Sequence, residues 1–126
     1  MKALIKPFSL ATALGVVSVL AVWAVSLALN VDLMVEPLNR VISPDFFVIF
    51  SLVGALGAFL VSVLLLRTKT PRKTGQIVGW LVLVASIATP LWGTQDLMAI
   101  IIIQASHFAI GVPLLVAMYK HLPEKK

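Results

Sequence analysis

Four long runs of apolar residues constrain this chain more than any other feature of its sequence. They cover residues 8–29, 46–66, 77–92 and 97–118. Because an α-helix rises about 1.5 Å per residue, about 20 apolar residues cross the ~30 Å hydrocarbon core of a bilayer. Each run is therefore a candidate transmembrane helix.

Composition supports this interpretation. The chain is 60% hydrophobic and 12% charged, against roughly 45–50% and 25% in an average soluble domain. Too few polar residues remain to cover the surface of a water-soluble globule. We expect residues 1–126 to form a single integral membrane domain of the all-α class, a four-helix transmembrane bundle in antiparallel up-down-up-down order.

The charges divide between the two ends of this bundle. Nine basic residues and one acid, Glu124, lie on one side; the basic residues are Lys2, Lys6, Arg67, Lys69, Arg72, Lys73, Lys120, Lys125 and Lys126. The other side carries Arg40 and four acids, Asp32, Glu36, Asp45 and Asp96. By the positive-inside rule the basic side is cytoplasmic. We expect a multi-pass protein of the cell (inner) membrane with both termini in the cytoplasm.

The sequence disfavours several classes of function. Without cysteine it has no disulfides, thiolate metal sites or thiol nucleophiles. The spans carry no acidic or cationic side chain other than a histidine, which disfavours a coupled pump. The basic residues are split among three short segments, unlike a nucleic-acid surface. We expect no enzyme activity, no catalytic or metal-binding residues and no cofactor.

The connections between the spans are short apart from residues 30–45. That segment contains apolar residues such as Leu33 and Ile42, so we expect it to lie on the membrane surface or over the mouth of the bundle. A packed connector is favoured over a lid. In the turn before the fourth span, Asp96 is well placed to cap the helix N-terminus.

Small residues recur at helical spacing and predict where helices pack closely, since lipid gives no hydrophobic force between helices. The candidate packing positions are Gly54, Ala58, Gly75, Gly79 and Gly111. In the first span, Ala11 with Gly15 offers a similar pair. We interpret these positions as contacts within one bundle rather than as a homodimer face.

A polar stripe on the fourth span supplies the best candidate site. Gln104, His107 and Gly111 are three and four residues apart and therefore share a helix face. His107 lies about 15 Å along the helix from the start of the span, near the bilayer midplane. A histidine at that depth needs a partner, and the candidates on other spans are Ser86, Thr89, Ser18 and Ser51.

Three interpretations of His107 remain open at this point. It can fix the helix register through hydrogen bonds to a neighbouring span, contact a ligand, or serve as an axial haem ligand, which would need a second histidine from another copy. Two prolines bear on the choice. Pro90 and Pro113 are expected to kink or unwind their helices, which either opens a small cavity or only shapes the packing.

A resemblance fits these features. Ser86-Ile87-Ala88-Thr89-Pro90-Leu91 closes the third span, and Ser106-His107-Phe108 lies in the middle of the fourth. Together with the basic middle loop, these motifs resemble a family of small four-span bacterial membrane proteins, a domain of unknown function. The resemblance implies the four-helix fold and His107 as a shared feature, with no reaction attached.

We therefore expect a non-catalytic small integral membrane protein that is an accessory or structural component of a membrane assembly. The alternative is a small-ligand binding or transport protein with a polar pocket around Gln104 and His107, to which Ser86 and Thr89 contribute. The expected partners are the lipid bilayer and either other membrane subunits or a second copy, and not nucleic acid.

Overall fold

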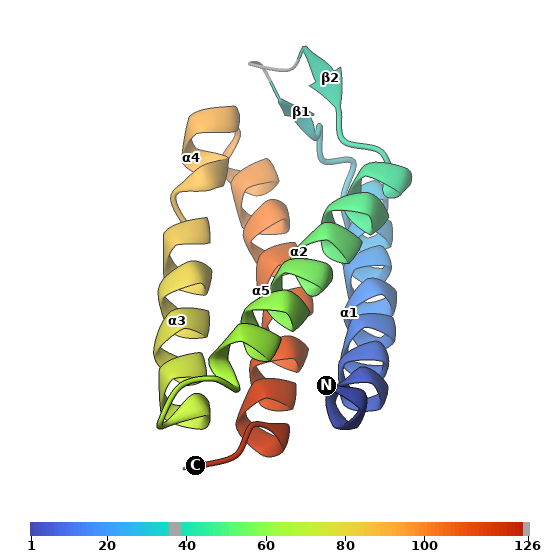
Figure 1. Cartoon of the computed structure of the whole chain (residues 1–126). Coiled ribbons are helices and arrows are strands. Elements are labelled where there is room, and N and C mark those ends of the chain that lie inside the picture. The colour runs from blue at the N-terminus through green and yellow to red at the C-terminus, as the bar shows by residue number, and fades with distance from the viewer. Residues whose placement is uncertain (36–38, 125–126) are drawn as a thin grey trace.

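Four long helical segments make up most of the chain (Figure 1). The structure, a computed structural model, describes residues 1–35 and 39–124. Its elements are α1 (Lys2–Ala28), β1 (Met34–Val35), β2 (Arg40–Val41), α2 (Pro44–Leu65), α3 (Pro71–Ser86), α4 (Thr89–Gly93) and α5 (Leu97–His121). Glu36, Lys125 and Lys126, which contribute to the predicted charge bias, lie outside the described residues.

The four segments are long and apolar enough to cross a membrane, at Lys2–Ala28, Pro44–Leu65, Pro71–Gly93 and Leu97–His121. The chain is thus a small membrane protein with the predicted four-helix fold. In Figure 1 each long segment runs opposite to the one before it, consistent with up-down-up-down order. The helices extend past the predicted apolar runs. For example, Pro71 begins α3 six residues before Ile77, because proline is well tolerated in a first helical turn.

The third span is broken near its C-terminal end, as Pro90 predicts. Proline lacks the N–H that would bond to the Ser86 carbonyl, and α3 ends at Ser86. The amides of Ile87 and Ala88 instead bond three residues back, at 3.1 and 3.2 Å. The short helix α4 then begins at Thr89. Pro113 does not break its helix: α5 continues through this residue as one helix.

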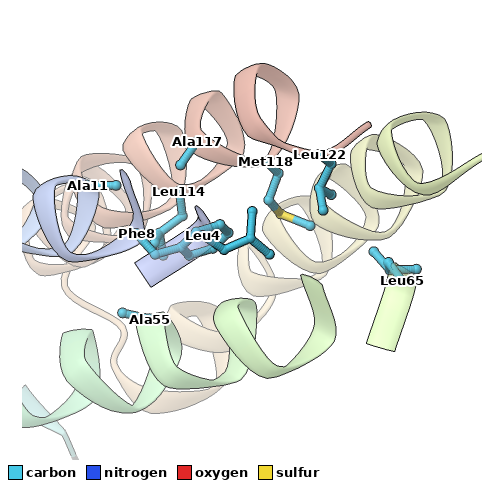
Figure 2. Packing of buried hydrophobic residues seen from close by; sticks show 9 residues of the cluster. All are labelled: Leu4, Phe8, Ala11, Ala55, Leu65, Leu114, Ala117, Met118 and Leu122. Atoms are coloured by element: carbon cyan, nitrogen blue, oxygen red, sulfur yellow. The ribbon is translucent and has the colours of Figure 1, made fainter. Parts of the chain in front are cut away.

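The first core cluster lies at the end of the bundle where both chain termini are found (Figure 1). Figure 2 shows its buried side chains, which come from α1, α2, the second half of α5 and Leu122 just after it. Phe8 meets the ring of Phe59 edge to face, with centroids 5.7 Å apart, a preferred aromatic geometry. Further along α1, Gly15 lies directly against Ile110 of α5. Through these contacts α1 is held against both α2 and α5.

The second core cluster lies at the opposite end, beneath a small antiparallel hairpin. Met34 pairs with Val41 and Val35 with Arg40. Leu33 and Ile42, which flank the hairpin, are 3% and 8% exposed and pack with Val19, Phe47, Ala99, Ile102 and Ile103. The prediction of a packed connector is confirmed by this burial, whereas the hairpin itself was not anticipated.

Arg72, at the start of α3, holds the end of α5 in place. Its Nε donates to the Leu122 carbonyl at 2.9 Å, and its guanidinium also pairs with Glu124 at 2.8 Å. The backbone amide of Arg72 donates to the Pro123 carbonyl at 3.0 Å. Leu122 is fully buried and lies beside Gly75. The start of α3 and the residues that follow α5 therefore form one packed unit.

We expect Arg72→Ala to lower the free energy of unfolding by about 1–2 kcal/mol, since it removes charge-assisted hydrogen bonds from a half-buried site. Glu124→Gln should cost less than about 1 kcal/mol, because Glu124 is 77% exposed and such pairs contribute little. Lys73→Ala, an exposed neighbour, is the control. Thermal unfolding in detergent, followed by circular dichroism, measures all three. Equal losses from Arg72→Ala and Glu124→Gln would mean that the ion pair, not the carbonyl contact, holds the end of α5.

Candidate functional site

A cavity of about 680 Å³ lies between α2, α3 and α5. In Figure 1, α2 runs obliquely across the bundle, near α3 at one end and away from it at the other. Val35 and Ile42, which flank the hairpin connection, line the end of the cavity nearest the hairpin. Its volume is within the range of roughly 300–1,000 Å³ found for small-molecule sites.

The wall of the cavity formed by α2 contains two glycines, Gly54 and Gly57. No atom lies within 4 Å of a Cβ placed on either residue. The prediction that Gly54 packs against a neighbouring helix is therefore wrong for this chain: α2 turns that side toward the cavity. Ala58, the next predicted packing residue, also lines the cavity and packs against the first core cluster.

The other glycines of the predicted set lie where α3 meets the second half of α5, and two of them, Gly79 and Gly111, also line the cavity. A Cβ on Gly111 would come within 2.7 Å of a methyl of Leu83. Gly79 lies directly against Leu115, and a Cβ on Gly75 would approach Leu122 to 2.8 Å. These three positions let the two helices approach closely, as small residues do in membranes.

Three of the four predicted polar residues lie around the same cavity. Ser86 and Thr89 come from the two sides of the break between α3 and α4, and His107 comes from α5. Thr89 is exposed, whereas Ser86 and His107 are half-buried. The break caused by Pro90, which also lines the cavity, thus contributes to the same wall as the histidine.

Gln104 lies apart from this group. Its side-chain Nε2 donates to the Ile87 carbonyl in the break between α3 and α4, and its Oε1 is buried with no partner among the described residues. Because the last carbonyls of a helix have no partner within it, the amide satisfies a group that the break leaves free. Gln104 is the polar interhelical contact, rather than a wall of the pocket.

His107 bonds to its own helix rather than to a neighbouring span. Its Nδ1 is 2.8 Å from the Ile103 carbonyl, one turn earlier in α5. The predicted hydrogen bond to Ser86, Thr89, Ser18 or Ser51 is therefore not formed. The physical reason is local: a carbonyl four residues back is within reach of a side chain on the same helix face.

The serine hydroxyls around the cavity also bond to their own helices. Ser51 donates to the Phe47 carbonyl at 2.7 Å, and Ser86 donates to the Leu83 carbonyl at 2.6 Å. Ser106, a lining residue absent from the predicted site, donates to the Ile103 carbonyl at 2.6 Å. Each hydroxyl hydrogen is thus engaged within its own turn.

Several residues that line the cavity were not among the predicted site residues. Gly57 lies three residues after Gly54 and on the same face, a spacing that could have revealed it. Phe46 and Phe50 of α2 also line the cavity. Their rings are stacked, with centroids 4.3 Å apart. In an apolar helix, no sequence signal separates such aromatic residues from those that face lipid.

Comparisons with known proteins add a family and no activity. Neither the curated proteins nor the solved structures contain a match to this chain. A family model described as "Family of unknown function (DUF6069)" matches residues 1–124. The match spans both core clusters and every residue that lines the cavity, in agreement with the resemblance noted from the sequence. The chain belongs to this family of unknown function.

Proposed function

We propose that this chain is a non-catalytic membrane protein that binds a small apolar or amphipathic molecule in the cavity between α2, α3 and α5. One observation carries the proposal: a space of about 680 Å³ lies within the membrane-spanning part of the molecule. Its walls are apolar apart from a few groups that include His107. Binding sites are commonly concave, mostly apolar and provided with a few polar groups.

The same walls favour binding over catalysis. Among the described lining residues, His107 is the one imidazole, and none is Asp, Glu, Lys or Arg. Its neighbour Ser106 gives its hydrogen to the Ile103 carbonyl, so no nucleophile is paired with the imidazole as acyl-transfer chemistry requires. The described residues contain no cluster of three or more metal-ligating side chains.

Filling the cavity tests the proposal. Gly54→Leu adds a side chain toward the cavity from a position with nothing within 4 Å of its Cβ. We expect this variant to fold as the unmodified protein does and to lose most of any small molecule that co-purifies from membranes. Native mass spectrometry after mild extraction measures the occupancy.

The matched control is Ala21→Leu, which enlarges an exposed residue of α1 outside the cavity. Its bound molecules should be unchanged. Equal occupancy in all three proteins, or none in the unmodified protein, would contradict a binding function for the cavity.

The role of accessory or structural component is the second candidate, and the α2 surface favours it. Gly54 and Gly57 are exposed and would allow a helix from another subunit or a second copy to approach closely. Gly57→Leu would then remove a partner subunit that is detected in complex with the unmodified protein by native mass spectrometry. Detection of the monomer alone, for both the unmodified protein and Gly57→Leu, would contradict this candidate.

We further propose that the protein lies in the cell (inner) membrane with both termini in the cytoplasm. The charge bias supports this orientation, since lysine and arginine in short loops favour the cytoplasmic side. The basic turn between α2 and α3 lies at the same end of the molecule as both termini (Figure 1).

A further inference from the structure

The two ring nitrogens of His107 face different surroundings. Nδ1 lies 2.8 Å from the Ile103 carbonyl, and because a carbonyl only accepts hydrogen bonds, Nδ1 carries the hydrogen of this bond. In the uncharged ring, Nε2 then has a free lone pair and acts as an acceptor. Among the described residues, the bond at Nδ1 is the one hydrogen bond that the ring makes. The ring lines the cavity, so this acceptor is available to a molecule bound there.

The serines of the cavity do not compete for this acceptor. Ser51, Ser86 and Ser106 each donate to a carbonyl of their own helix. A bound molecule that brings its own donor would therefore satisfy Nε2, which the protein leaves unpaired. An unmade hydrogen bond in an apolar site costs free energy, so a ligand with such a donor is preferred over one without it.

The cavity also selects against charge. None of its described lining residues is Asp, Glu, Lys or Arg. A phosphate, carboxylate or ammonium group moved into such a space would lose its hydration and meet no side chain that carries a permanent charge, which is unfavourable. The polar group of a fitting ligand is therefore uncharged.

The exposure of the lining residues indicates where a ligand enters. Phe50 of α2 and Val82 of α3 are 60% and 65% exposed, and both line the cavity. In a chain that spans the membrane, exposed apolar residues within the spans face lipid. The cavity thus opens between α2 and α3 toward the hydrocarbon layer, and its ligand is a molecule dissolved in the bilayer.

We propose that the cavity binds an uncharged amphiphile from the lipid phase, whose hydroxyl donates a hydrogen bond to Nε2 of His107 and whose apolar tail lies between α2 and α3. This inference rests on the proposed binding function and specifies its ligand class. Long-chain alcohols and other neutral lipids with one free hydroxyl belong to this class, whereas fatty-acid anions and charged phospholipids do not.

Three probes with the same tail test the head group: 1-hexadecanol, its methyl ether and hexadecanoate. The protein is placed in nanodiscs of phosphatidylcholine, a lipid without a hydroxyl donor, and equilibrium binding of each labelled probe is measured. We expect the alcohol to bind roughly 3- to 10-fold more tightly than the ether, the difference expected for one net hydrogen bond. Hexadecanoate should bind more weakly than the alcohol.

Nitrogen NMR locates the contact. The chain has two histidines, and His121 lies exposed at the end of α5, so it serves as an internal reference. In protein labelled with ¹⁵N-histidine, the alcohol should shift the Nε2 resonance of His107, and the ether should not. The His121 resonances should stay in place with both probes.

His107→Phe is the decisive variant, because it keeps a planar ring and removes the acceptor. The Ile103 carbonyl still accepts from Ser106, so no carbonyl is left unpaired and the protein should fold. In this variant the alcohol and its methyl ether should bind with about equal affinity.

Two outcomes would overturn the assignment: equal binding of alcohol and ether by the unmodified protein, or an alcohol preference that survives His107→Phe. If both uncharged probes bind equally and Gly54→Leu blocks them, the cavity is still a binding site and the head-group inference alone fails. If neither probe binds, or if Gly54→Leu blocks neither, the proposed function fails as well.

Discussion

Gly15→Leu is expected to separate α1 from α5 and to prevent stable folding. Gly15 lies directly against Ile110, and a Cβ at this position would come within 3.2 Å of the Ile110 Cα as well as against its side chain. A backbone atom cannot rotate away as a side chain can. Overpacking costs typically 1–3 kcal/mol and occasionally more, and we expect about 3 kcal/mol or more here.

Two further leucine substitutions calibrate this effect. Gly79→Leu should be less damaging, because its nearest neighbour is the end of the Leu115 side chain, which can adopt another rotamer. Gly54→Leu should leave the melting temperature nearly unchanged, since its Cβ has nothing within 4 Å. Thermal unfolding in one detergent ranks the three variants. If Gly15→Leu had the same melting temperature as Gly54→Leu, α1 would not pack closely on α5.

The number and positions of the spans could be predicted from the sequence because they depend on segment length and hydropathy, which are local. Local chemistry likewise predicted two helix boundaries. Asp96 caps α5 by accepting from the Met98 amide at 2.9 Å, and Pro90 interrupts the third span. Ser43 stands at the N-cap position of α2, but its side chain makes no capping bond.

Which face of each helix meets which neighbour could not be predicted in the same way. The glycine spacing marks a face of α2 that can be approached closely, but it does not say whether a helix occupies that face. The answer depends on the direction of α2, which is held at one end by Phe59 on Phe8 and at the other by Phe47 in the second cluster. These contacts join residues far apart in the chain, and the cavity beside Gly54 follows from them.

The sequence predicted which residues belong to the site better than it predicted how their side chains are arranged. The spacing of Gln104 and His107 suggested that they act together on one face, yet Gln104 bonds to the Ile87 carbonyl and His107 faces the cavity. Residues three apart on a helix differ by about 60° in direction, enough to point one toward α3 and the other toward the gap between α2 and α3. The hairpin was missed for a related reason: its strands are two residues each, too short to carry an alternating pattern.

The orientation of the bundle gives the second large effect, because a residue is accessible from one side of the membrane and not from the other. Figure 1 places both termini and the turn between α2 and α3 at one end, and the hairpin and the turn before α5 at the other. Within residues 1–35 and 39–124, the first end carries every basic residue except Arg40. Basic residues in short loops resist transfer across the membrane and are attracted to anionic cytoplasmic lipids, at about 1 kcal/mol each. Their sum over three segments strongly favours a single orientation.

Single cysteines can report this orientation cleanly, because the chain has no cysteine of its own. Lys69 and Gln95 lie at opposite ends, and both are exposed. In intact cells, a membrane-impermeant maleimide should label Gln95→Cys and leave Lys69→Cys unlabelled. After the membrane is permeabilised, both should react, which controls for buried or oxidised thiols. Labelling of Lys69→Cys alone in intact cells would reverse the orientation, and labelling of both would mean that the chain inserts in two directions despite its charge bias.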